Sequence, residues 1–179
     1  MEQNKILDLL NQMSLEEKVG QLVQLTPDFF SKGGEITGPM QEWNMSKEQL
    51  FQVGSVLGTH RKEQVLEIQE KYLAENRLKI PLIFMADVIH GYETIYPIPL
   101  ALAASFDSDV IEEMAALSAE EASQAGIHVT FSPMVDHVKD SRWGRVLESN
   151  GEDVELSKEL TRAYVRGYQG PEAIRVFSC

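Results

Sequence analysis

The chain has 179 residues, of which 43% are hydrophobic and 25% charged, so it is long enough for one globular domain and too apolar for a disordered segment. Its formal net charge of −12 argues against nucleic acid or an anionic membrane as a partner, because both need a positive protein surface. The single cysteine, Cys179, excludes an internal disulfide and a zinc-thiolate cluster. With polar residues interrupting the leucines near the N-terminus, these features predict a cytoplasmic protein without a membrane span.

Amphipathic spacing predicts two short helices at the N-terminus. The first covers Ile6–Met13, and Ser14 with Glu17 forms a capping-box pattern that opens the second. The end of the second helix is ambiguous, because Gln21–Thr26 also fits the alternation of a strand.

A long connection and a strand-helix pair follow. Pro27–Trp43 contains three glycines and two prolines, which predicts a loop, and its Gly33-Gly34 pair lacks the frame of a phosphate-binding loop. Val53–Leu57 lies between glycines and predicts a short strand. Lys62–Asn76 then repeats apolar residues at helical spacing and leads toward the next strand.

An apolar run ends abruptly on an acid in the middle of the chain. Pro81–Met85 is continuous in its apolar character, which is typical of a strand buried on both faces of a parallel sheet. Asp87 follows almost at once. Because the carboxyl ends of parallel strands carry the chemistry of α/β folds, Asp87 is a functional candidate.

The next helix and strand repeat this arrangement. After a turn region, Ser108 is predicted to cap a helix that closes at Gly126, where a left-handed conformation suits glycine. Ile127–Val135 predicts a second strand, and Asp136 follows it directly. Two strands that each end on an acid favour a shared functional edge of one sheet.

The last third predicts a polar loop over Lys139–Asp153 and a helix from Leu156 that stops near Gly167 and Gly170. The final stretch, Ala173–Cys179, fits either the start of another strand or an unrelated tail. The strand-helix order, with connections long enough for crossovers, indicates an α/β fold with a parallel sheet.

Candidate functional residues are charged side chains at the ends of the two strands or in the loops that follow. They are Asp87, His90, Asp136, His137, Asp140, Arg142, Arg145, Glu148, Glu152 and Asp153. Carboxylates accept hydrogen bonds from hydroxyl groups and a guanidinium donates in a fixed fork, so sugars are the favoured ligand class.

Two other interpretations of these residues compete with sugar binding. Asp136 and Asp140 also fit simple loop caps, and Arg142 and Arg145 fit ion pairs with Glu148, Glu152 or Asp153, which is the commoner role of exposed charges. A metal site built from the histidines and aspartates is disfavoured because no ligand pair has the spacing that places both on one helical face. No metal or cofactor is therefore expected.

Five motifs, in order, closely resemble glycoside hydrolase family 3, the family of β-glucosidases and β-xylosidases. They are SLEEKVGQ from Ser14, ADVIHG from Ala86, FSPMVD from Phe131, DSRWGR from Asp140 and GED from Gly151. The DVIHG and RWGR elements resemble the β-glucosidase branch more than the β-N-acetylglucosaminidases of the family.

The resemblance implies an α/β fold, about half of a TIM-type (β/α)8 barrel with parallel strands and flanking helices, formed by residues 1–179 as one truncated domain. It implies that Asp87 and Arg145 bind hydroxyls of the terminal sugar of a β-glycoside, glucose-like in character. Trp143 is expected to shape the Arg145 loop, and His90 to shape the strand end with a possible direct contact to sugar. A complete barrel needs roughly 250 residues, which supports the expectation of a partial one.

The family pattern also includes residues that are not matched in this sequence. The Lys-His-Phe strand end, the Ser-Asp-Trp motif with the nucleophilic aspartate, and the acid/base glutamate are all expected beyond the C-terminus. Retaining hydrolysis needs two carboxyl groups about 5 to 5.5 Å apart. No catalytic residue is therefore predicted in this chain, and the isolated chain is expected to be inactive.

The resulting hypothesis is a β-glucosidase-like hydrolase of carbohydrate metabolism, to which this chain contributes a sugar-binding wall. Two alternatives stay open: a non-catalytic sugar-binding module, and a structural half-barrel that assembles with itself. Exposed sheet edges and apolar strand faces predict a homodimer or a larger homo-oligomer.

Overall fold

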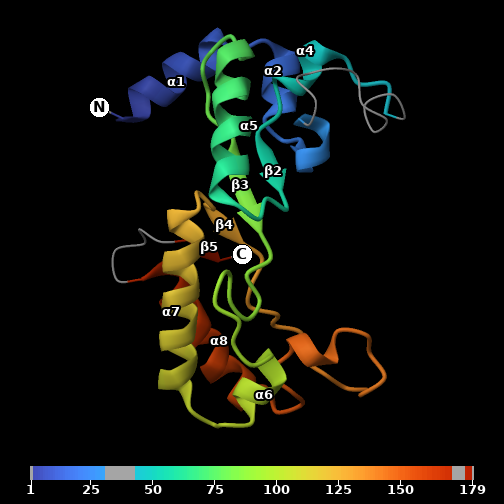
Figure 1. Cartoon of the computed structure of the whole chain (residues 1–179), viewed down its shortest axis with the longest axis vertical. Coiled ribbons are helices and arrows are strands. Elements are labelled where there is room, and N and C mark those ends of the chain that lie inside the picture. The colour runs from blue at the N-terminus through green and yellow to red at the C-terminus, as the bar shows by residue number, and fades with distance from the viewer. Residues whose placement is uncertain (1, 31–42, 171–175, 179) are drawn as a thin grey trace. The chain divides into compact units, whose positions relative to one another are not determined.

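The computed structural model describes residues 2–30, 43–170 and 176–178 (Figure 1). The chain divides into two compact units, Met1–Met85 and Ala86–Cys179. The prediction of a single truncated domain over 1–179 stays a prediction. The predicted loop over Pro27–Trp43, with its Gly33-Gly34 pair, lies largely outside the described residues.

The first unit combines helices with short parallel strands. Its elements are α1 (Glu2–Gln12), α2 (Leu15–Gly20), β1 (Gln24–Leu25), the 3-10 helix η1 (Pro27–Phe30), α4 (Lys47–Leu50), β2 (Ser55–Leu57), α5 (Lys62–Glu75) and β3 (Ile83–Ala86).

The strands of the first unit pair in parallel in the order β1, β2, β3. The central pair Val56 and Phe84 is fully buried, whereas Ile83 on the alternate face of β3 is 46% exposed. Because side chains alternate along a strand, one face of this sheet is packed and the other is more open, so the prediction that the β3 strand is buried on both faces is wrong at Ile83. The Gln21–Thr26 ambiguity resolves in favour of both elements, since α2 ends at Gly20 and β1 begins at Gln24.

Helix α5 is tied to the segments that enter β2 and β3. The Tyr72 hydroxyl donates to the Val53 carbonyl at 2.6 Å, and the Gln69 amide oxygen accepts from the Leu82 amide at 3.0 Å. The buried Asn76 amide donates to the Phe51 carbonyl at 2.8 Å. Buried polar groups are stable only with such partners, so these bonds fix where each strand begins.

The second unit is built on a pair of long helices. Its elements are α6 (Pro99–Ala103), α7 (Ser108–Gln124), β4 (Val129–Thr130), the 3-10 helix η2 (Val146–Glu148), α8 (Val154–Gln169) and β5 (Phe177–Ser178). Figure 1 shows α7 and α8 side by side, and they share the most extensive contact between elements of this unit.

Gly167 explains how closely the two helices approach. A Cβ atom at this position would lie 2.4 Å from the Glu112 carbonyl oxygen and 2.6 Å from the Ala115 Cβ, so a larger residue cannot be accommodated without a shift. The prediction that the last helix stops near Gly167 is therefore wrong at that residue. Helix α8 continues to Gln169 and ends at Gly170, whose φ of 68° is in the region that favours glycine.

Two further predictions need correction. Asp107, not Ser108, caps α7, and its carboxylate accepts from the Asp109 and Val110 amides. The strand predicted over Ile127–Val135 is limited to Val129–Thr130. Pro133 lacks an N–H group and cannot extend a strand ladder, which is consistent with this early end.

The strand alternative for the final stretch is confirmed at Phe177–Ser178. This strand, β5, pairs in parallel with β4, with Val129 opposite Phe177 and Thr130 opposite Ser178. Among the residues that the structure describes, no helix is long and apolar enough to cross a membrane.

An ion pair holds the start of the first unit. Glu17, whose side chain is 12% exposed, accepts from Arg77 Nε at 2.8 Å and Nη2 at 2.7 Å, and also from the Ser14 amide at 2.8 Å. Hydrogen bonds from Arg77, then from the Ser14 backbone, lower the pKa of Glu17 from 4.5 to about 2. The carboxylate therefore stays ionised in the folded chain at moderately acidic pH.

We predict an acid-dependent contribution of Glu17 to stability. Because its folded-state pKa is depressed, its contribution is present above its ordinary pKa of 4.5 and is lost as the pH falls toward about 2. The Glu17→Gln variant should lose stability at pH 7 and show a shallower decline of melting temperature over that acidic window. Circular dichroism melts at a series of pH values measure this, with Glu67→Gln, an exposed acid of α5, as the control. Parallel pH profiles for Glu17→Gln and the unmodified chain would contradict it.

Candidate functional site

The peptide that follows Asp87 is held from both sides in the second unit. The Val88 amide donates to Thr130 Oγ1 of β4 at 3.2 Å, and the Val88 carbonyl accepts from the Tyr168 hydroxyl of α8. Thr130, Val88 and Tyr168 are all buried, while Asp87 is exposed. Burial raises the pKa of Tyr168, so its hydroxyl keeps the proton that it donates. The backbone next to Asp87 is therefore fixed, and the Asp87 side chain is exposed to solvent.

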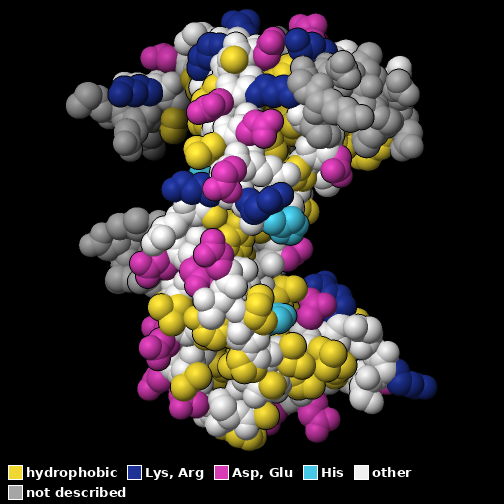
Figure 2. Space-filling view, viewed as in Figure 1, with side chains coloured by type: hydrophobic (Ala, Val, Ile, Leu, Met, Phe, Trp, Pro, Cys, Tyr) yellow, Lys and Arg dark blue, Asp and Glu magenta, His cyan; other side chains and the backbone are white. Residues whose placement is uncertain are grey.

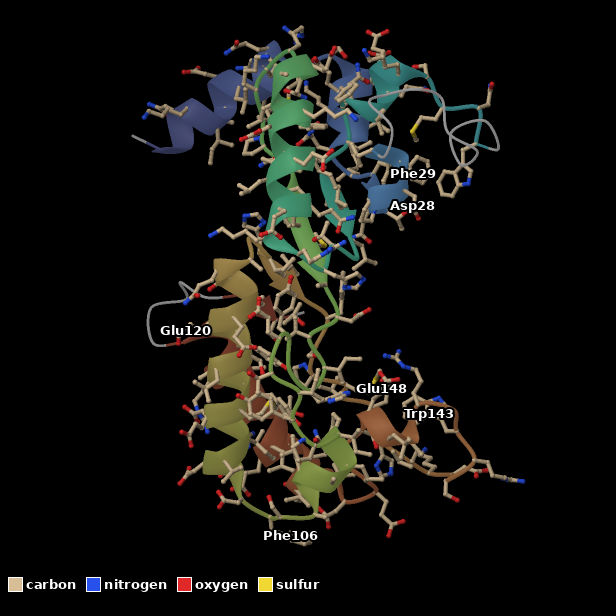
Figure 3. All side chains as sticks on the ribbon, viewed as in Figure 1. Asp28, Phe29, Phe106, Glu120, Trp143 and Glu148 are labelled. Atoms are coloured by element: carbon tan, nitrogen blue, oxygen red, sulfur yellow. The ribbon has the colours of Figure 1, made fainter. Side chains whose placement is uncertain are left out.

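Arg145 lies in the loop between β4 and α8, just before η2. Tight turns lead to it: the Trp143 amide donates to the Asp140 carbonyl at 3.1 Å, and the Val146 amide to the Trp143 carbonyl at 3.2 Å. Trp143 is half-buried, and Figure 3 shows it beside Glu148 in this part of the chain. The prediction that Trp143 belongs to the Arg145 loop thus agrees with its position, while a role in sugar binding stays a prediction.

The Arg145 guanidinium pairs with Glu148. Nε lies 3.2 Å from both carboxylate oxygens, and Nη2 lies 2.7 Å from Oε2. This hydrogen bonding is the main cause that raises the pKa of Arg145, and the charges of Asp87 and Asp136 raise it further. The acids after β3 and β4 therefore act on the same guanidinium. We call Asp87, Asp136, Arg145 and Glu148 the acid-arginine cluster.

His90 has a structural attachment of its own. Its Nδ1 lies 2.9 Å from the Tyr96 carbonyl oxygen, and the Tyr96 amide donates to the His90 carbonyl at 2.8 Å. Since a carbonyl only accepts, Nδ1 carries the proton. Between them, Gly91 has a φ of 121° and a Cβ there would lie 1.9 Å from the Thr94 carbonyl oxygen. His90 closes the turn after β3, and its predicted contact with sugar stays a prediction.

Glu121 of α7 anchors the same turn. Its Oε2 accepts from the Glu93 amide at 3.0 Å and the Thr94 amide at 2.9 Å, and its Oε1 from the Thr94 hydroxyl at 2.6 Å. These bonds, those from Thr94 being the largest, lower the pKa of Glu121. Sequence patterns did not single out Glu121, because its partner turn is distant in the chain.

Two other candidate residues, Asp140 and Asp153, stabilise local backbone structure. Asp140 accepts from the Arg142 amide at 2.9 Å and pairs with the same guanidinium, so the loop-cap interpretation holds for Asp140. Asp153 caps α8 by accepting from the Leu156 amide at 2.8 Å. His137 and Glu152 are exposed. Within the described ranges, no three His, Cys, Asp or Glu side chains gather to hold a metal ion.

Comparison with known proteins identifies the class of this chain. The model of the glycosyl hydrolase family 3 N terminal domain matches residues 14–177. The chain is 36% identical over 167 residues to the periplasmic β-glucosidase of Salmonella typhimurium, a match that covers 92% of this chain and 20% of that protein. The chain therefore belongs to glycosyl hydrolase family 3, and by homology it is β-glucosidase-like.

Solved structures agree with this assignment. A β-glucosidase from Listeria innocua in complex with glucose is 50% identical, with a TM-score of 0.93 over 100% of this chain and 26% of that chain. A mutant β-glucosidase from Listeria innocua in complex with laminaribiose is 53% identical, with a TM-score of 0.90 over 96% of this chain and 24% of that chain. The predicted fold class is confirmed as α/β, a partial TIM-type barrel with parallel strands and flanking helices. The chain spans about a quarter of the length of these structures.

The buried Tyr168 hydroxyl that holds the Val88 carbonyl gives a paired prediction. Tyr168→Phe should destabilise the chain by about 1 to 3 kcal/mol, because the buried Val88 carbonyl loses its donor. Tyr164→Phe is the matched control: it lies one turn earlier on α8, its ring stacks on Tyr168 at 6.2 Å, and its buried hydroxyl has no partner among the described residues. Removal of the Tyr164 hydroxyl should leave the free energy of unfolding unchanged or raise it. Urea unfolding followed by circular dichroism measures both, and equal effects of the two variants would contradict the assignment.

Proposed function

We propose that this chain forms one wall of the terminal-sugar pocket of a β-glucosidase-like hydrolase. The ligand is the terminal non-reducing glucose-like residue of a β-glycoside. Asp87 accepts hydrogen bonds from its hydroxyl groups, and Arg145 donates to its oxygen atoms. His90 and Trp143 line the same region.

The observation that carries the proposal is that the charges of two strand-end acids both act on one guanidinium. Asp87 follows β3, Asp136 follows β4, and both act electrostatically on Arg145. Vicinal hydroxyl groups both donate and accept, so a neutral sugar matches a mixed set of carboxylate acceptors and guanidinium donors better than an anion does. The glucose and laminaribiose complexes of the Listeria innocua relatives support this ligand class.

We further propose that retaining hydrolysis requires residues outside this chain. The nucleophilic aspartate and the acid/base glutamate must be placed about 5 to 5.5 Å apart, and neither is assigned to a residue here. The short span of the chain relative to its relatives supports this division. A non-catalytic sugar-binding role for the chain alone follows from the same wall.

Isothermal titration of the chain with glucose tests sugar binding. We expect measurable binding that Asp87→Ala abolishes, since the variant removes a carboxylate acceptor while Asp87 is exposed and not part of the core. Asp109→Ala, an exposed acid in the first turn of α7, is the control and should bind as the unmodified chain does. Full glucose affinity in Asp87→Ala would overturn the proposed wall.

On an aryl β-glucoside the chain should show no turnover, and turnover would overturn the proposed division of the catalytic residues.

We also propose that the chain forms a homodimer or a larger homo-oligomer. The partly open sheet face that carries Ile83 supports this, because exposed apolar strand faces are normally covered. Light scattering should give at least twice the mass of 20.2 kDa, and a monomer at micromolar concentration would contradict it.

A cytoplasmic location is proposed on the single cysteine alone, and relatives include proteins named as periplasmic and lysosomal.

A further inference from the structure

We propose that Glu148 is a positioning residue for the sugar site: it binds one edge of the Arg145 guanidinium and so directs the remaining N–H groups toward the sugar that Asp87 binds. This inference rests on the proposed function and deepens it. Glu148 itself is not assigned any contact with the ligand. Its effect is exerted through Arg145.

The geometry of the pair supports this role. Glu148 engages Nε and Nη2 of Arg145, and Nη1 is not part of the pair. A guanidinium is planar and rigid, so fixing one edge also fixes the direction of the third nitrogen. Two N–H groups on Nη1 then point in a defined direction and can donate hydrogen bonds to a ligand oxygen.

Glu148 is itself held by a firm part of the second unit. It ends η2, and its amide donates to the Arg145 carbonyl at 3.0 Å. The next residues, Ser149 and Asn150, are buried, and the Ser149 hydroxyl donates to the Val146 carbonyl at 2.7 Å. An orienting side chain needs such a rigid base, because a mobile one would transfer its motion to its partner.

Glu148 also lies beside the segments that carry the two acids. It lines a small hollow together with Ile89, which follows Asp87 by two residues, and with Met134, which precedes Asp136 by two residues. Figure 3 shows Glu148 on the side of the second unit where the β4-α8 loop emerges. The Glu148 side chain is 29% exposed and the Arg145 side chain is 56% exposed. The more buried acid therefore holds the more exposed guanidinium.

The same loop contains a second pair that serves as a control. Arg142 and Asp140 also form a bidentate ion pair, but their side chains are 88% and 49% exposed. The pKa of Arg142 is raised by Asp140, with no contribution from Asp87 or Asp136, in contrast to Arg145. Exposed pairs of this kind contribute little to stability, and an asparagine Oδ1 can still accept from the Arg142 amide, so Asp140→Asn removes the ion pair and keeps the loop cap.

The first experiment measures the order of Arg145 by NMR, with no ligand added. In the unmodified chain we expect a slowly exchanging Arg145 Nε–H signal, assigned by its loss in Arg145→Lys. Glu148→Gln is isosteric and should broaden or average this signal, whereas Asp140→Asn should leave it unchanged. An unchanged Arg145 signal in Glu148→Gln would overturn the positioning role, whether or not the chain binds sugar.

The second experiment is a double-mutant cycle on glucose affinity. Glu148→Gln should weaken binding roughly tenfold, because a misdirected donor loses its hydrogen bond to the ligand. In an Arg145→Ala background the same change should have no further effect, since Glu148 acts only through Arg145. Equal weakening in both backgrounds, or full affinity in Glu148→Gln, would overturn the inference. Absence of glucose binding by the unmodified chain would instead overturn the proposed function, and the NMR result would then decide the positioning role alone.

Discussion

The candidate site depends on the hydrogen bonds to the backbone of one buried residue, Val88. Its amide and its carbonyl are both removed from water, and each is satisfied by a side chain from a different element, Thr130 of β4 and Tyr168 of α8. A buried peptide group without partners costs far more than a satisfied one contributes, so the chain is held strictly at this point. Asp87 directly precedes Val88, so the fixed Val88 backbone also sets the direction in which the Asp87 side chain leaves the chain. The close approach of α7 and α8 at Gly167 brings α8 to the position from which Tyr168 reaches the strand end.

The charges around this point determine what the site can bind. Three carboxylates, those of Asp87, Asp136 and Glu148, act on the single guanidinium of Arg145. The local balance is acidic, as is the whole chain with its net charge of −12, so an anionic ligand would be repelled. Figure 2 shows more acidic than basic side chains on the visible face of the second unit. A neutral ligand rich in hydroxyl groups uses the carboxylates as acceptors and does not need their charge to be cancelled.

The sequence predicted those parts of the fold that depend on local chemistry. The Ser14 and Glu17 capping box is present with both of its hydrogen bonds, and the strand before Asp87 lies where its apolar run predicted. Asp107 was missed as a helix cap because Ser108 beside it is an equally good capping residue by type, and only backbone geometry selects between them. The second strand was predicted too long, since periodicity does not show which residues have a pairing partner.

The sequence named the members of the candidate site, but not most of the hydrogen bonds between them and the rest of the chain. Strand-end acids and the following arginine were found from their places in the chain, and the motifs gave the family. Tyr168 and Thr130 were not found, because a tyrosine or threonine on a buried face looks like ordinary core until its hydroxyl is seen to hold a distant peptide. The sequence did allow Asp140 as a loop cap and Arg145 as the partner of a nearby acid, but it did not select Glu148 among the acids of this polar loop. Only the structure shows that Glu148 binds the guanidinium on which the charges of Asp87 and Asp136 also act.

The most direct test of the account is a crystal structure of this chain with bound glucose. The account predicts glucose hydroxyl groups within hydrogen-bond distance of both the Asp87 carboxylate and the Arg145 guanidinium, with the Val88 peptide still bound by Thr130 and Tyr168. Glucose bound without contact to either Asp87 or Arg145 would contradict it.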